Sequence, residues 1–308
     1  MLDASKAPTY RSGEHSVPAA SAGAAPETRG TALEFLRGLA TEVSKGSVDL
    51  PCFPNVVIRI RNALADPATT QEKTVTIVGA EPRLAARLLQ TANSAAFNPA
   101  GKPLTDLRSA ITRLGHQLVQ SAAMAYAVQV IRNAESLRSI AQPLLQLWSE
   151  CVSVAAVSQA VASRTKINPD EAFLTGLLHG IGRLYIMVRS VAYTGQLGND
   201  RSLLDFVADW HASIGKTVLE NWGFSEQMCA AVGDQNDYER RWKHDSELTD
   251  VLIASIVLAA ALKDPAPRTV DMEGISAFQN LRLTEQDCHA TLARARQHLG
   301  SLHDALGC

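Results

Sequence analysis

The stretch NPDEAFLTGLLHGIGRL, residues 168–184, carries a helix start followed by a histidine in an apolar run. Asn168 is a residue type that caps helix starts, and Pro169 suits the first helical position. The two acidic residues that come next place negative charge at the positive end of the helix dipole. The apolar residues beyond them recur at helical spacing. The stretch therefore predicts a helix that carries His179 into the protein interior.

The same helical periodicity continues over nearly the whole chain from Thr31 onward. Alternating runs bounded by turn residues, which indicate strands, are absent from the sequence. We therefore predict an all-α, multi-helix fold. Besides the helix that begins after Asn168, the predicted helices cover residues 33–45, 54–65, 71–80, 82–97, 106–114, 116–132, 143–164, 202–209, 211–222, 225–235, 247–263 and 284–303.

The chain divides into a tail and two helical lobes. Residues 1–29 are rich in Ala, Ser, Gly and Pro, a composition that cannot offset the entropy lost on ordering, so we expect a disordered tail. The helical pattern is interrupted over residues 132–143. We therefore predict an N-terminal lobe over residues 31–132 and a second lobe over residues 143–308. The amphipathic helix after Thr284 is expected to pack on the second lobe, with self-association as the alternative.

Composition and charge argue against several classes of protein. Of the 308 residues 46% are apolar, and the net charge is -2, which gives no basic footprint for nucleic acid or an anionic membrane. The five cysteines, at positions 52, 151, 229, 288 and 308, include no CxxC pair, which favours reduced thiols in the cytoplasm. No basic segment followed by an apolar core marks a secretory signal. The apolar stretches at 117–131 and 251–262 are too short to span a bilayer and are predicted to be core helices.

Three phrases of the first lobe follow one another in order, namely LPCFPNVVIRI (50–60), EPRLAARLLQTANSAAF (81–97) and LRSAITRLGHQLVQSAAMAYAV (107–128). In content and spacing they resemble the HDOD domain family, and with the second lobe the resemblance covers about residues 45–262. It implies a bacterial regulatory module of signal transduction, usually without demonstrated enzymatic activity, whose second lobe is an HD-like helical bundle. The expected partners are signalling or regulatory proteins that bind the surface of the two lobes.

Residues 176–184, GLLHGIGRL, resemble the signature of the HD superfamily of metal-dependent phosphohydrolases with one change. HD enzymes follow the signature histidine with an aspartate, whereas this chain has Gly180 after His179. The pair therefore offers one imidazole nitrogen and no carboxylate oxygen to a metal cluster. The resemblance implies a hydrolase frame that no longer hydrolyses.

The other ligand positions implied by the HD resemblance depart in the same way. The first ligand histidine corresponds to Glu150, and the last ligand aspartate corresponds to Ala260. A further histidine position falls at Gln235-Asn236, whereas His211 keeps its imidazole. We expect no catalytic residue, no metal and no cofactor at these positions, because a two-metal clamp lacks its carboxylates.

Two alternatives stay open for this site. Glu150, His179 and His211 combine two imidazoles with one carboxylate, a set that binds zinc in some hydrolases, so a weak metal-dependent phosphohydrolase is one alternative. A nucleotide-binding sensor is the other, with Arg183 or Lys216 contacting an anionic ligand. The interpretations we favour are a buried His179 bonded to backbone or to Glu150, and solvated surface cations at Arg183 and Lys216.

Three further residues have both a structural and a functional interpretation. Asn93, near the end of its helix, is a candidate partner contact, but a bond to local backbone is favoured. Trp210 and Trp222 are candidate binding hot spots, but packing in the core is favoured for both. Gly223 is predicted to end its helix in a left-handed conformation.

Overall fold

The computed structural model describes residues 35, 37–39, 41–43, 45, 55–66, 68–95, 97–99, 101–194, 201–240, 247–262, 272 and 274–306. Over these residues every regular element is a helix, which confirms the all-α prediction. The predicted tail over residues 1–29 lies outside the described residues, as do Cys52 and Cys308.

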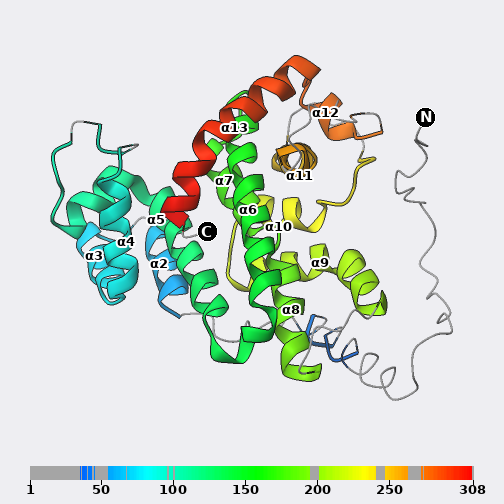
Figure 1. The fold of residues 1–308 in the computed structure, drawn as a ribbon, viewed down its shortest axis with the longest axis horizontal. Helices are drawn as coiled ribbons and strands as arrows, with labels where there is room; N and C mark the ends of the chain where they lie inside the picture. Colours follow the sequence, from blue (N-terminus) through cyan, green and yellow to red (C-terminus); the bar gives the residue numbers. More distant parts are fainter. Residues whose placement is uncertain are drawn as a thin grey trace.

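Four helices form the part of the fold on the left of Figure 1. They are α2 (Asn55–Ala65), α3 (Gln71–Gly79), α4 (Pro82–Ala92) and α5 (Leu107–Arg132). Pro82 opens α4, as predicted. Gly115 interrupts α5 with φ 73° and ψ 165°, a conformation that glycine adopts without steric penalty. This kink is the break predicted between residues 106–114 and 116–132.

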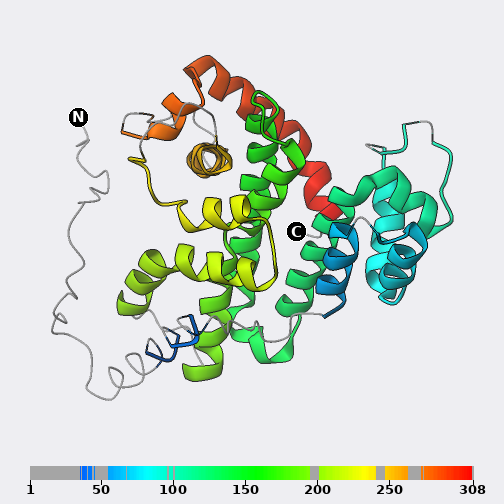
Figure 2. The same cartoon turned by 180° about the vertical axis from the view of Figure 1, so that it is seen from behind.

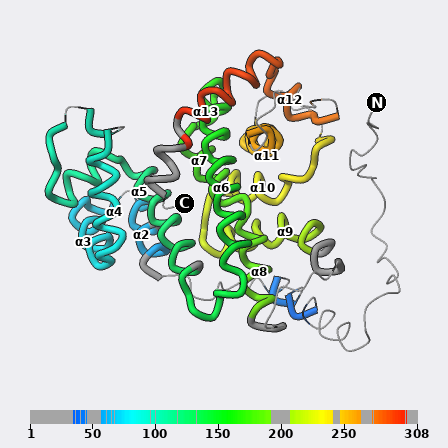
Figure 3. Tube along the Cα trace, in the orientation of Figure 1, coloured from blue at the N-terminus to red at the C-terminus, as the bar shows by residue number. Residues whose placement is uncertain are grey.

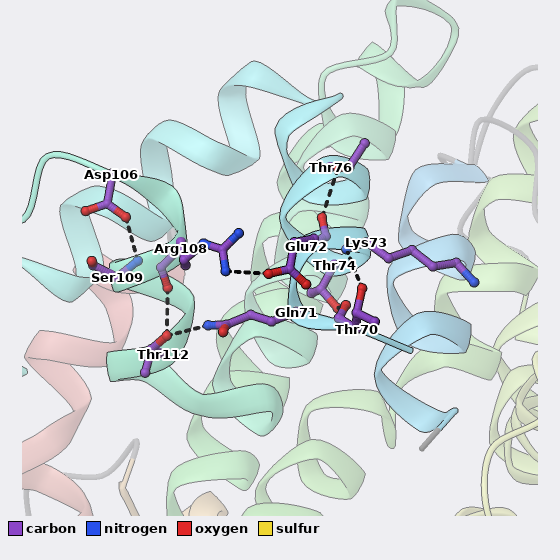
Figure 4. A network of polar contacts seen from close by, with 10 residues as sticks. All are labelled: Thr70, Gln71, Glu72, Lys73, Thr74, Thr76, Asp106, Arg108, Ser109 and Thr112. Atoms are coloured by element: carbon purple, nitrogen blue, oxygen red, sulfur yellow. Dashed lines mark hydrogen bonds and ion pairs between the residues drawn. The ribbon is translucent and has the colours of Figure 1, made fainter. Parts of the chain in front are cut away.

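Polar side chains connect α3 to the start of α5, as Figure 4 shows. Thr70 caps the start of α3. Between the helices, Arg108 Nη1 lies 2.7 Å from Glu72 Oε1, and the Gln71 amide donates to Thr112 Oγ1. At least half of each side chain in the ion pair is exposed, so water screens the pair and it adds little to stability. The contacts therefore fix the orientation of α3 more than they stabilise the fold.

The remaining elements form the larger part of the molecule. They are η1 (Glu135–Ile140), α6 (Ala141–Ala162), α7 (Pro169–Leu178), α8 (Ile181–Thr194), α9 (Arg201–Asn221), α10 (Glu226–Gly233), α11 (Leu248–Leu262), α12 (Ser276–Asn280) and α13 (Glu285–Leu306). In both Figures 1 and 2, α8 to α11 follow one another along one side of α6.

Three helix predictions for this part were wrong or incomplete. The segments at 202–209 and 211–222 were predicted as two helices, but they belong to the single helix α9. Residues 208–213 contain no glycine or proline to break it. The helices α8 and α12 were not predicted as separate elements. Because only a short turn at Gly180 separates α7 from α8, the apolar pattern of the sequence continues through the turn and does not show where one helix ends and the next begins.

The central helix of the fold is α6, which packs against α7, α11 and α13. Most of its buried side chains belong to one apolar cluster that also includes Leu88 of α4 and Ile131 of α5. The segment Glu135–Ala162, which includes α6, is long and apolar enough to cross a membrane, but 67% of its most apolar window is buried inside the protein. Within the described residues it serves as the core around which both parts of the fold pack.

The helix α13 runs from α12 along α6 and reaches α4 and α5 (Figure 1). Leu292 and Ala295 are buried on its inner face. Near its start, Arg164 donates to the Asp287 carboxylate. The predicted packing of this helix within the chain is thus confirmed.

The N-terminal helical residues lie beside α8 (Figure 3). Phe35 and Leu39 are buried, and the Glu42 carboxylate accepts hydrogen bonds from Tyr185 and Arg189 of α8. Burial, together with Glu42, raises the pKa of Tyr185. This segment therefore braces the helix that carries part of the site described below.

Candidate functional site

His179 lies at the carboxyl end of α7 and is fully buried, as predicted. The helix begins in the expected way, because Asn168 Oδ1 accepts the N–H of Asp170 at 2.9 Å and Pro169 stands in the first turn. The Nδ1 atom of His179 lies 2.7 Å from the carbonyl oxygen of Gly176. A carbonyl only accepts, so Nδ1 carries the hydrogen of this bond. The bond directs the Nε2 atom toward α6 and α8.

Glu150 of α6 and Arg183 of α8 contact the Nε2 side of His179. Arg183 Nη2 lies 2.8 Å from Glu150 Oε1 and 3.2 Å from His179 Nε2, and Glu150 Oε1 lies 3.9 Å from the same nitrogen. A guanidinium only donates hydrogen bonds, so Arg183 contacts His179 Nε2 when the imidazole is neutral and Nε2 accepts. When the imidazole is protonated, Nε2 carries a hydrogen and pairs with the Glu150 carboxylate. The three side chains form one charge cluster around the imidazole.

His211 of α9 is 8% exposed, and its backbone lies against α8 at Gly182. Its Nε2 atom lies 3.3 Å from the amide nitrogen of Asn236, and its Nδ1 atom has no hydrogen-bond partner among the described residues. The amide of Gln235 donates to the carbonyl oxygens of His179, at 3.2 Å, and Val232, at 2.8 Å. The pair Gln235-Asn236 thus connects the two histidines from the end of α10.

The two buried imidazoles have opposite pKa shifts. Burial lowers the pKa of His179, but Cys151 and Glu150 counteract burial and raise the pKa to about 9. Burial, the Arg183 charge and His179 lower the pKa of His211 to about 4. His211 is therefore neutral at neutral pH, and His179 takes up a proton far more readily.

Two glycines define how closely the helices approach at this site. A Cβ atom on Gly180 would lie 2.7 Å from Cys151 Sγ and 2.9 Å from Leu147 Cδ1. The place of the signature aspartate is therefore closed by α6 side chains. A Cβ atom on Gly182 would lie 1.8 Å from the carbonyl oxygen of His211, so α8 and α9 cross in backbone contact.

A metal centre of the HD type does not fit these residues as they are arranged. The described part of the chain contains no group of three or more His, Cys, Asp or Glu side chains placed to hold a metal ion. Glu150 and His179 both face the Arg183 guanidinium. Ala260, the position of the last ligand, is exposed near the end of α11 and does not line the buried cluster. The other positions that the HD resemblance implied lie at the site described above, namely Glu150, His179, Gly180, His211, Gln235 and Asn236.

The two candidate cations have different environments, and one of the two predictions was wrong. Lys216 is 46% exposed and lies 4.0 Å from Glu220, as expected for a surface cation. The Arg183 side chain, predicted to be solvated, is only 26% exposed and pairs with Glu150. Arg183 lies in the first turn of α8, so its contact with His179 spans the turn between α7 and α8.

Asn93 binds backbone, as favoured, but not the backbone of its own helix. Its Oδ1 accepts the N–H of Leu104 at 2.7 Å, and its Nδ2 donates to the carbonyl oxygen of the same residue at 2.8 Å. Both polar atoms of the amide are therefore used to close the loop between α4 and α5.

The two tryptophans have different outcomes. Trp222 is buried, and Gly223 follows it with φ 68°, which confirms the left-handed cap. The cap has the expected bonds, because the N–H of Phe224 donates to the Leu219 carbonyl at 3.0 Å. Trp210 was predicted to be in the core, but it is 45% exposed. The prediction was wrong because it rested on residue type alone, whereas the position of Trp210 on α9 leaves nearly half of the side chain in solvent.

Sequence reasoning assigned no role to Gly182 or to Gly215, which lie at the crossing of α8 and α9. The N atom of Gly215 would lie 2.7 Å from a Cβ atom on Gly182. A glycine inside each of two apolar helices was the available signal for a close crossing. Cys151, treated only as a small apolar residue, is indeed buried, and it also contacts the site at Gly180.

Comparison with known proteins gives a family and a fold. The HDOD domain model matches residues 50–238. A Shewanella amazonensis structure named "putative metal-dependent phosphohydrolase" is similar with a TM-score of 0.65 and 20% identity, over 90% of this chain and 99% of that one. A Marinobacter aquaeolei structure named "putative signal transduction protein" has a TM-score of 0.59 and 18% identity, over 91% and 66%. An uncharacterized Treponema pallidum protein is 22% identical over 232 residues, and this chain spans only 43% of its length.

Proposed function

The chain belongs to the HDOD domain family, and from this premise we propose that it is a cytoplasmic bacterial signal-transduction protein that binds signalling or regulatory proteins and does not catalyse a reaction. The observation that carries the proposal is the closed position at Gly180. Cys151 and Leu147 fill the space that a side chain would need there, so a carboxylate at this position would have to displace these two α6 side chains. The buried free thiols of Cys151, Cys229 and Cys288 support a reducing compartment.

A binding role and a catalytic role make different demands on His179. Catalysis at an HD-type site depends on metal and on this imidazole. Binding through the surface of the fold depends on neither, because His179 is fully buried. Replacing His179 while the fold is kept therefore separates the two roles.

The experiment measures partner binding by the full chain and by His179→Ala, each with and without EDTA. A signalling or regulatory protein captured from the source bacterium is purified, and its affinity for each variant is measured by calorimetry. We expect saturable binding that changes less than about 2-fold, well under 1 kcal/mol, with either treatment. Circular dichroism confirms that the variant is folded. The absence of any stoichiometric partner, or binding abolished by EDTA, would contradict the proposal.

One observation favours a second candidate, a sensor that binds an anionic ligand such as a nucleotide. Arg183 Nε and His211 Nδ1 are both buried, and neither has a hydrogen-bond partner in the described part of the chain. Two such donors suit the oxygens of a phosphate. This candidate ranks second because Arg183 Nη2 is already bound to Glu150 and His179. Calorimetry against a nucleotide panel tests it, and a flat result across the panel removes it.

A further inference from the structure

The N-terminal helical residues pack on a part of the fold that they do not adjoin in sequence. Residues 35, 37–39 and 41–43, here called the N-terminal segment, lie beside α8 in Figures 1 and 2, whereas α2, the next element along the chain, packs against α5. We propose that the face of α8 under this segment is a docking site for an amphipathic helix of a partner protein, and that the partner displaces the segment. The inference rests on the proposed binding of partner proteins and identifies the surface that carries it.

Three side chains of the N-terminal segment define what the docking site recognises. Phe35 and Leu39 are buried, and the Glu42 carboxylate accepts hydrogen bonds from Tyr185 and Arg189 of α8. Positions i, i+4 and i+7 lie on one face of a helix, so the two apolar side chains are buried on the same side that carries the carboxylate to α8. The face of α8 therefore fits a helix with an aromatic residue, a leucine and an acidic residue at this spacing.

Charge selects the residue at the third of these positions. Both groups that α8 presents to Glu42 are donors, because a guanidinium has no acceptor and the Tyr185 hydroxyl directs its hydrogen to the carboxylate. Tyr185 is fully buried, whereas the Arg189 and Glu42 side chains are 33% and 30% exposed, so the ion pair lies at the rim of the buried contact. A lysine or arginine in place of Glu42 would face the like charge of Arg189. The partner helix is therefore acidic at this end of the contact.

The N-terminal segment is a weak helix that a better helix can replace. Gly38 is exposed, and a Cβ atom added to it would meet nothing within 4 Å, so packing does not require glycine there. Glycine in a helix interior is unfavourable relative to alanine. The described helical residues extend only from 35 to 43, fewer than the ~12–15 residues that an isolated helix needs in water. The segment therefore owes its helical form to its contacts with the rest of the protein, and a partner helix with the same three side chains and no glycine would compete for them.

The experiment measures the binding of a fluorescein-labelled peptide of residues 31–46 to the full-length protein by fluorescence anisotropy. The peptide supplies the docking helix in trans and competes with the attached segment, whose effective concentration is on the order of millimolar. In the double variant Phe35→Ala with Leu39→Ala, the attached segment loses its two buried apolar side chains. We expect this variant to bind one peptide per chain at least ~10-fold more tightly than wild type, because truncating buried apolar side chains weakens the competitor.

Three altered peptides, each titrated into the double variant, assign the binding to the proposed contacts. A peptide with Glu42→Gln should bind ~10-fold more weakly, because it loses hydrogen bonds to a charged group. The matched control is a peptide with Arg37→Gln, changed at an exposed position, which should bind within ~2-fold of the unaltered peptide. A peptide with Gly38→Ala should bind ~3–5-fold more tightly, because its helix forms more readily and the added methyl group meets no neighbour.

Circular dichroism establishes whether each full-length variant is folded. Full-length Glu42→Gln should also bind the peptide more tightly than wild type, and it replaces the double variant if the latter is unfolded. The proposal is overturned if the weakened variant binds the peptide no more tightly than wild type, or if neither protein binds it saturably. A wild-type dimer that the double variant dissociates would also overturn it, since the site would then hold the segment of a second copy. None of these results decides whether the full chain captures a partner protein, which tests the proposed function separately.

Discussion

Replacing Gly182 by alanine tests the crossing of α8 and α9 that brings Arg183 next to His211. The added Cβ would lie 1.8 Å from the His211 carbonyl oxygen and 2.7 Å from the N atom of Gly215. Real Cβ atoms essentially never approach closer than 3.0 Å, so the first contact is 1.2 Å too short (3.0 minus 1.8). Overpacking of a core costs ~1–3 kcal/mol, and we expect the upper end because both opposing atoms are backbone. Alanine returns at most ~1 kcal/mol through helix propensity, so the net loss should be ~2 kcal/mol or more.

Gly233→Ala is the matched control, since this glycine also stands in a helix with one short contact. Its Cβ would meet Lys216 Cδ at 2.8 Å, but the Lys216 side chain is 46% exposed and can move aside. We expect a change within ~1 kcal/mol of wild type, in either direction. Urea unfolding followed by circular dichroism measures both variants, with unchanged m-values as the condition for comparing them. A Gly182→Ala protein as stable as the Gly233→Ala protein would refute the close crossing.

Three further predictions concern individual polar residues. His211→Gln should flatten the acid side of the plot of stability against pH. The folded pKa of His211, about 4, lies below the ordinary histidine value of 6.5, so wild type loses up to ~3 kcal/mol as pH falls from 6.5 to 4. Parallel curves for the two proteins would rule this out. Asn93→Ala removes both bonds to Leu104 and should destabilise the protein by ~1–2 kcal/mol in urea, whereas an unchanged midpoint would show that the loop closes without them. Glu42→Gln removes the charge that Arg189 pairs with and should lower the free energy of unfolding by ~1–3 kcal/mol. The backbone amides of α8 should then exchange hydrogen faster than in wild type, and an unchanged exchange rate would contradict a bracing role.

Much of the fold follows from local signals in the sequence. Asn168 and Pro169 fixed the start of α7, and Gly115 and Gly223 marked the kink of α5 and the end of α9, because each of these residue types restricts backbone conformation. The single helix α9 was missed at Trp210, where no breaker stands. Hydrophobic periodicity alone does not distinguish one long helix from two shorter consecutive helices.

The site was predicted less completely, because its key contacts join helices distant in sequence. The resemblance gave His179, Gly180 and His211, and the structure brings these positions together. It did not predict that Arg183 would bind Glu150 across the interface of α6 and α8. Most arginines are exposed, so residue type alone favours the wrong answer, and only the arrangement of α6, α7 and α8 in the fold places the guanidinium against the imidazole and Glu150.

The measurement that tests the central claim most directly is phosphoester hydrolysis by the full chain. Purified wild type and His179→Ala are assayed with magnesium, manganese or zinc against a cyclic dinucleotide and a chromogenic phosphodiester. Because α6 side chains fill the position after His179 and Arg183 contacts both Glu150 and His179, we predict that wild type shows no turnover above that of His179→Ala with any of the three metals. Turnover at an enzyme-like rate that His179→Ala abolishes would contradict the account and identify the chain as a hydrolase.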